Sequence, residues 1–305
     1  MKAVASHRQA NGKGGELKYV YYPSGGGNRI QWQYDSYHRP SQLYRRAGGN
    51  EVRVGRWTWN NDGSPLWFRR GNDIDTTFEY DTIGRQSRSR TVNSGGATIF
   101  DVRHEYDKEG NRLTQRIVTG ETNWSELYEY DTLYRLVNMK RGNVWYDAGQ
   151  QKWVCTSATR AENWNLDLLG NWSEYDVSGD ESISEDRTHN VLNQITAINQ
   201  TSLTYDLQGN LTDDGAKKYV WDIAGRLRQV KDKATQQVIE TYDYDAYGRR
   251  TTKANSDGTF RYYYDGWRVI EERFADAWSA RNVWGLYLDE LVVRTNLYGG
   301  GTDLY

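Results

Sequence analysis

The sequence predicts an all-β fold built from consecutive antiparallel β-hairpins. Three observations predict it: a short cassette recurs ten times, residues ahead of the cassettes alternate with period two, and no stretch shows a useful helical stripe. The cassette is an aromatic residue, Asp or Asn, two variable residues, Gly, and then Arg or Asn. Consecutive copies start about 16 to 36 residues apart, which is typical of a protein whose repeats are single supersecondary units.

The ten cassettes differ in how closely they follow the pattern. The clearest copies begin at Tyr80, Tyr106, Tyr205, Trp221 and Tyr244. Weaker copies begin at Tyr34, Trp59, Tyr130, Leu166 and His189.

Turn chemistry explains the cassette. A short acceptor at the second position can bond backbone N–H groups two residues on, and glycine three residues later suits a left-handed backbone that leads into a bulge. The predicted turn residues in the clearest copies are Asp81, Gly84, Asp107, Gly110, Asp206, Gly209, Asp222, Gly225, Asp245 and Gly248. Where glycine is missing, Asn193 suits the left-handed region, but Tyr134 does not and His38 does so poorly. We expect distorted turns at Tyr134 and, to a lesser degree, at His38.

The residues before each turn alternate as strands do. In one example Phe100, Val102, His104 and Tyr106 share a face, with charged residues between them. The aromatic residue that precedes each turn should then lie on one packed face of a continuous sheet. We expect a stacked row made by Tyr80, Tyr106, Tyr130, Tyr205, Trp221 and Tyr244.

Composition supports this fold and excludes several classes of protein. The 305 residues include 24 Tyr and 13 Trp, with a mean hydropathy of −0.92, so burial must rest on large amphipathic rings. The net charge of −2 leaves no basic field for nucleic acid. No apolar run reaches membrane-spanning length, and the first fifteen residues lack the apolar core of a signal peptide.

Catalytic and metal-binding patterns are weak in this sequence. Cys155 is the single cysteine, the four histidines are scattered, and the recurring Asp is accounted for by the turns. The acidic residues between 174 and 186 could hold a divalent cation, yet they lack the ordered spacing of a calcium loop; they are Asp176, Asp180, Glu181, Glu185 and Asp186. We therefore expect no enzyme activity, no metal and no cofactor.

The chain departs from regular spacing at about residues 141–187. We expect an inserted hairpin with a solvated loop or, alternatively, a contact surface for a sugar or protein, with Trp145, Trp153 and Trp172 as candidate binding residues. We expect residues 1–18 to be poorly ordered and residues 19–305 to form a single repeat segment.

At this point the cassettes indicate a family. Tyr-Asp-x-x-Gly-Arg/Asn at this spacing resembles the YD repeats of rearrangement hotspot (Rhs) proteins, which also occur in teneurins and in shell components of insecticidal toxin complexes. The resemblance runs from about Tyr21 to Leu297, and it includes blocks outside the turns at residues 164–172, 188–195, 263–272 and 283–291. It implies a strip of sheet that spirals into a hollow shell around a C-terminal toxin or other cargo.

The resemblance also sets expectations for function. The chain lacks the Asp-Pro self-cleavage motif of complete members, so we expect a shell segment without the protease or effector, whether a fragment or a short stand-alone protein. The implied partners are the remainder of an Rhs shell, a C-terminal effector or a second copy, which would cover residues 287–305. The implied location is secreted or at the cell surface. The alternative is an adhesion module that binds carbohydrate, such as a surface glycan, or protein through exposed Trp, Tyr and Arg side chains.

Overall fold

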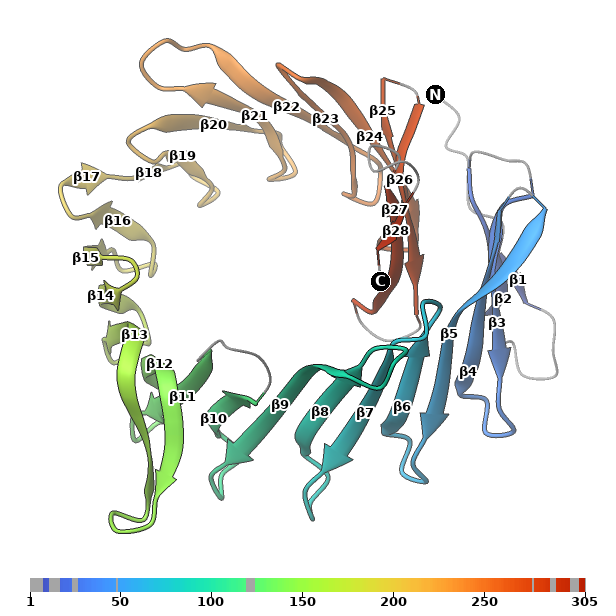
Figure 1. Cartoon of the computed structure of the whole chain (residues 1–305). Helices are drawn as coiled ribbons and strands as arrows, with labels where there is room; N and C mark the ends of the chain where they lie inside the picture. Colours follow the sequence, from blue (N-terminus) through green and yellow to red (C-terminus); the bar gives the residue numbers. More distant parts are fainter. Residues whose placement is uncertain are drawn as a thin grey trace. The chain divides into compact units, whose positions relative to one another are not determined.

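The computed structural model describes residues 8–10, 17–23, 27–47, 49–118, 124–275, 277–285, 289–296 and 302–304. These residues contain only β-strands, turns and irregular segments, which confirms the predicted all-β class (Figure 1). The first seventeen strands are β1 Arg8–Ala10, β2 Leu17–Tyr21, β3 Arg29–Tyr34, β4 Pro40–Ala47, β5 Asn50–Trp59, β6 Pro65–Arg70, β7 Asp75–Tyr80, β8 Gln86–Val92, β9 Thr98–Tyr106, β10 Arg112–Ile117, β11 Ser125–Tyr130, β12 Leu136–Asp147, β13 Lys152–Leu166, β14 Trp172–Gly179, β15 Ile183–His189, β16 Ile195–Ile198 and β17 Thr201–Ser202.

A second sheet follows after Leu203. Its strands are β18 Thr204–Tyr205, β19 Leu211–Asp213, β20 Lys217–Trp221, β21 Leu227–Asp232, β22 Val238–Tyr244, β23 Arg250–Asn255, β24 Gly258–Asp265, β25 Arg268–Phe274, β26 Ala277–Trp284, β27 Leu291–Asn296 and β28 Thr302–Leu304. The strands of the described residues are thus divided between a 17-stranded and an 11-stranded sheet.

Each strand in these sheets pairs with the next one along the chain. In the hairpin of β11 and β12, for example, Tyr128 lies opposite Met139 in an antiparallel register. The register shifts by one residue just before the cassette aromatic, as at Tyr34, Tyr130 and Tyr244. This is the bulge expected beside a left-handed turn residue, which is Gly248 in the third of these copies and His38 or Tyr134 in the other two.

Because strand direction alternates along the chain, the connections between strands fall into two sets. Each cassette turn joins two antiparallel strands, and the strands that lead into these turns all run in the same direction within a sheet, so the cassette turns lie at one edge of it. We call this the cassette edge. The connections between hairpins lie at the opposite edge.

The chain forms two compact units. Unit 1 consists of residues 1–76 and 220–305, and unit 2 consists of residues 77–219. In unit 1, early strands contact late ones: the Tyr22 hydroxyl donates to the Asn282 carbonyl at 3.2 Å, and Trp57 Nε1 donates to Glu290 Oε1 at 3.0 Å. Arg45 also donates to the Thr295 hydroxyl at 2.8 Å.

A hydrophobic core fills unit 1. Leu43, Val54 and Val293 have no exposed surface, and Trp57 stacks on Phe68 with ring centroids 4.7 Å apart. In unit 2 the buried apolar side chains are fewer among the described residues: Val102, Leu127, Met139, Val144 and Val177. Unit 2 therefore depends more on contacts within its sheet than on a packed core.

Two expectations about local structure are wrong. His38 and Tyr134 adopt the left-handed backbone with φ of 62° and 60°, yet their turns are regular. The Tyr134 N–H donates to the Asp131 carbonyl at 3.0 Å, as the glycines of other copies do. The surrounding turn contacts hold the backbone in this conformation, although it costs about 1–2 kcal/mol in a residue with a Cβ.

The segment 141–187 also differs from expectation. It contains no inserted hairpin; the extra residues lengthen β12 to 12 and β13 to 15 residues, and the acidic stretch forms the hairpin of β14 and β15. Most of residues 1–18 lie outside the described residues, and the expected single segment from 19 to 305 stays a prediction. No described segment is a helix able to cross a membrane.

Candidate functional site

The turn carboxylates bind the backbone of their own turns. Oδ1 of Asp81 accepts from the N–H groups of Ile83 at 3.0 Å and Arg85 at 2.9 Å. The same contacts recur at Asp131, Asp206, Asp222 and Asp245, and Asp107 accepts from Asn111 at 2.7 Å. These are the hydrogen bonds predicted from the cassette.

The cassette aromatic reaches back to the preceding hairpin. The hydroxyl of Tyr106 donates at 2.8 Å to the carbonyl of Gln86, the first residue after the preceding cassette turn. The same relation joins Tyr130 to Arg112, Tyr205 to Ile195, Tyr244 to Leu227 and Tyr264 to Arg250, at 2.7 to 2.8 Å. The indole N–H of Trp59 donates likewise to the Pro40 carbonyl at 2.7 Å. These rings therefore share one orientation along the sheet.

The cassette arginine reaches forward to the next hairpin. Nε of Arg85 donates to Asp81 Oδ2 at 2.6 Å within its own turn, and its Nη1 donates to the Asp107 carbonyl of the next turn at 2.9 Å. Its guanidinium also lies 4.6 Å from the centroid of the Tyr106 ring. Equivalent forward bonds run from Arg39 to Asn60, Arg135 to Asp167, Arg226 to Asp245 and Arg249 to Gly266.

Together these contacts form what we call the turn ladder: Asp holds Arg, Arg bonds the next turn and covers the next tyrosine, and that tyrosine bonds back. Guanidinium groups cover Tyr106 and Tyr244, two of the rings expected to form the stacked row, and they cover the equivalent ring of Tyr264 as well. Where Asn replaces Arg, the side chains of Asn111 and Asn210 bond the Asp of their own turn or a neighbour within it, whereas Asn171 also donates to Asn193 Oδ1 of the next turn at 3.1 Å.

Hydrogen bonds set the charge state of the ladder. The side chain and N–H of Asn210 hold the pKa of Asp206 below its ordinary value, against the opposing effect of burial. The N–H of Arg135 and then its guanidinium, again against burial, do the same for the pKa of Asp131. Burial raises the pKa of the Tyr205 hydroxyl, so it remains a hydrogen-bond donor at neutral pH.

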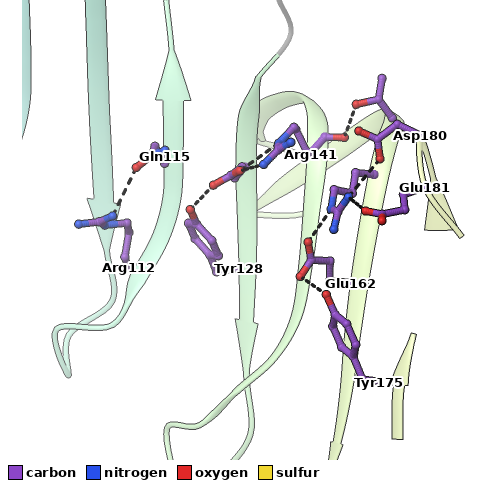
Figure 2. A network of polar contacts seen from close by, with 11 residues as sticks. Arg112, Gln115, Tyr128, Arg141, Glu162, Tyr175, Asp180 and Glu181 are labelled. Carbon is purple, nitrogen blue, oxygen red and sulfur yellow. Dashed lines mark hydrogen bonds and ion pairs between the residues drawn. The ribbon is translucent and has the colours of Figure 1, made fainter. Parts of the chain in front are cut away.

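A second polar network crosses the middle of unit 2 (Figure 2). Glu126 accepts from the Tyr128 hydroxyl at 2.5 Å and from Arg141 at 2.7 Å. Farther along, Arg160 bonds Glu162 at 2.5 Å, and its Nη1 lies 3.5 Å from Asp180 Oδ1 and 2.9 Å from Glu181 Oε2. Charged side chains thus take part in packing between strands.

The candidate binding tryptophans are not brought together. Trp145 and Trp153 lie near the tip of the β12–β13 hairpin, where Trp153 is opposite Tyr146. Trp172 lies opposite Leu166 at the other end of β13, roughly 40 Å along the strand at about 3.3 Å per residue. Trp172 instead joins Trp164 and Tyr175, with centroids 5.9 and 5.4 Å away.

The described cysteine and acidic side chains do not form a catalytic or metal-binding arrangement. Cys155 is half-buried, and burial raises the pKa of its thiol, which opposes nucleophilic use. No group of His, Cys, Asp and Glu suited to a metal ion occurs within the described part of the chain. Asp180 and Glu181 contact Arg160, Glu185 contacts Arg187, and Asp176 accepts from Ser184.

The sequence predicts the Asp and Gly of each turn but not the hydrogen bonds between turns. The signal that could have predicted those bonds is the regular recurrence of Arg at the end of one cassette and an aromatic residue at the start of the next. The buried ion pairs, such as Glu271 with Arg273 at 2.9 Å and Arg281 at 3.2 Å, had no comparable signal.

Comparison with known proteins agrees with this geometry. The family model for the teneurin YD-shell matches residues 69–268. Toxin subunit YenC1 of Yersinia entomophaga is 25% identical over 268 residues, which cover 74% of this chain and 27% of that protein. The tRNA nuclease WapA of Bacillus subtilis is 38% identical over 89 residues, covering 28% of this chain and 4% of that protein.

Solved structures show the same fold. The Photorhabdus luminescens Tc holotoxin pore carrying the TccC3-D651A mutation aligns with a TM-score of 0.74 and 21% identity, over 93% of this chain and 15% of the other. The TcdB2-TccC3-Cdc42 structure aligns with a TM-score of 0.74 and 19% identity, over 93% and 15% of the two chains. The chain thus spans only a small part of these relatives. With the family model matching most of its length and a ladder repeated from turn to turn, the chain belongs to the teneurin YD-shell family.

Proposed function

We propose that this chain is a wall segment of an encapsulating β-shell in a larger secreted or cell-surface bacterial protein related to toxins, with no catalytic activity of its own. The turn ladder carries the proposal. It uses the cassette Asp, the cassette Arg where present, and most cassette aromatics to join one hairpin to the next. A wall must resist opening between hairpins, and these bonds stabilise that contact.

The partners follow from the same role. The proposed partners are the rest of the shell and the effector or other cargo that it encloses, because the related YenC1 protein is a toxin subunit and exceeds this chain in length. The alternative adhesion role has less support, since its three candidate tryptophans lie at opposite ends of β13.

Electron microscopy of the full polypeptide in which this segment occurs would test the role. We expect residues 17–304 to form part of a hollow wall and the enclosed chain to resist added protease. A variant with Asp107→Ala and Asp245→Ala should admit protease sooner. Catalysis by the isolated chain, or a wall that excludes this segment, would contradict the proposal.

A further inference from the structure

The cassette edge of unit 2 carries a row of exposed apolar side chains. They occupy the variable positions of four consecutive cassette turns and, in the case of Tyr134, the glycine position of the first of them; the turns are at residues 131–135, 167–171, 190–194 and 206–210. Leu168, Val191 and Leu207 are 94%, 98% and 109% exposed. The full set, which we call the apolar turn row, is Leu133, Tyr134, Leu168, Leu169, Val191, Leu192 and Leu207.

Turn formation does not require these side chains. The neighbouring cassette turn has Lys108 and Glu109 at the same positions and keeps the same backbone bond, from Gly110 N–H to the Asp107 carbonyl. At the opposite edge of unit 2 the connections at 93–97, 148–151, 180–182, 199–200 and 214–216 contain only small or polar residues, and the described part of the β10–β11 connection adds the half-exposed Val118 and Trp124. The run of exposed apolar side chains over four consecutive turns thus belongs to the cassette edge, and such a patch indicates an interaction surface.

We propose that the apolar turn row is the contact surface between two copies of this chain. Successive turns are two strands apart, or roughly 9.5 Å. A row of turns with that spacing fits a second row with the same spacing, because the side chains on the turns of one copy can pack between successive turns of the other copy. An isologous two-fold contact needs one self-complementary patch, which this row provides.

The area of the row is consistent with such a contact. Burying an aliphatic side chain removes roughly 60 to 120 Å² of apolar surface from water. The six aliphatic side chains of the row and the ring of Tyr134 together give roughly 400 to 800 Å² per copy, approaching the ~800 Å² per partner of a stable interface. The Asp131, Asp167 and Asp206 carboxylates already accept hydrogen bonds within their turns, so closing the surface over them leaves no unpaired acceptor.

The test is the mass of the isolated chain in solution. Sedimentation velocity at tens of micromolar should show a dimer. A variant with Leu168→Gln, Leu169→Gln, Val191→Thr and Leu192→Gln should raise the dimer dissociation constant by roughly tenfold or more. The matched control is Ile83→Gln, which alters a turn residue that is 71% exposed and lies next to the polar Lys108–Glu109 turn, and it should leave the dimer intact. Circular dichroism should be unchanged in both.

Cross-linking locates the contact independently. Leu169→Cys and Leu192→Cys, each with Cys155→Ser, should be joined to each other by a short bismaleimide when mixed. Lys108→Cys in the same background should cross-link far less. A monomeric wild-type chain, or a dimer that the fourfold variant leaves intact, would overturn the inference. Since a wall segment could lack this contact, this result and the enclosing role can fail separately.

Discussion

Units 1 and 2 are built from the same cassette but stabilised differently. Of the twenty buried apolar side chains among the described residues, fifteen lie in unit 1 and five in unit 2. In unit 1 the strands near the beginning of the chain also contact those near its end, through Tyr22, Arg45 and Trp57. Unit 2 has the ladder and its cross-strand ion pairs, with little core beneath them. The comparison shows that the cassette specifies each hairpin, whereas a hydrophobic core forms only where hairpins from distant parts of the chain contact each other.

The largest expected effect comes from removing the unit 1 core. Trp57→Ala should lower the free energy of unfolding by about 3 to 5 kcal/mol, because it leaves a cavity beside Phe68 and removes the bond to Glu290. Hydrogen exchange should show lost protection in β2–β6 and β26–β27, with unit 2 unchanged. Trp57→Phe is the control and should cost much less. Equal loss of protection in unit 2 would mean that the two units unfold together.

The matching change in unit 2 removes a ladder ring. Tyr106 is half-buried, so Tyr106→Ala should cost about 2 to 3 kcal/mol, below the cost for a core aromatic, as it loses ring contact and a hydrogen bond. Tyr106→Phe keeps the ring and should cost about 1 kcal/mol. Urea unfolding measures both. A null effect for both variants would show that the ladder does not stabilise unit 2.

A smaller effect tests the turn carboxylates in both units. Asp107→Ala and Asp245→Ala should each cost about 1 kcal/mol, the usual net worth of such hydrogen bonds. Hydrogen exchange should distinguish them, with protection lost across neighbouring hairpins in unit 2 and only near the turn in unit 1. The reverse pattern would contradict the contrast drawn between the units.

Strain relief should give a small effect of opposite sign. Tyr134→Gly and His38→Gly remove the strain of a side chain on a left-handed backbone but increase the conformational entropy of the unfolded chain. Each should therefore stabilise the protein by roughly 0.5 kcal/mol. Thermal unfolding measures the gain. Tyr134→Ala retains the strain and serves as the control; a gain as large for alanine would refute this account.

The smallest expected effect is that of mild acid. The pKa values of Asp131 and Asp206 lie below the ordinary carboxyl value, so their contribution is complete above about pH 4. Stability should be nearly constant from neutral pH down to that point and should fall as pH drops through the lower folded pKa values. Unit 2 should lose amide protection first. Loss in unit 2 well above pH 4 would mean that other groups control its stability.

A contact could be predicted from the sequence only when its two partners are close together along the chain. The turns at Asp81 and Asp245 were predictable because donor and acceptor lie within four residues. The Trp57–Glu290 bond was not, since 233 residues separate its partners and no pattern relates them. Trp153 and Trp172 were grouped as neighbours because the sequence does not show that β13 would extend over 15 residues. The prediction for Tyr134 is wrong because the hydrogen bonds of its turn hold the residue in a backbone conformation that its type disfavours.

The ladder also has a consequence for how such chains can change length. The side chains of each cassette form hydrogen bonds within their own turn and with the adjacent hairpins, so any neighbouring hairpin with the same cassette supplies the partners that they need. Duplicating or deleting a pair of strands inside unit 2 would preserve the donors and acceptors of the turn ladder, whereas gaining one strand would reverse the order of edges. Genes for these proteins can therefore be extended by copying one hairpin at a time, with no new contact to be invented at the junction.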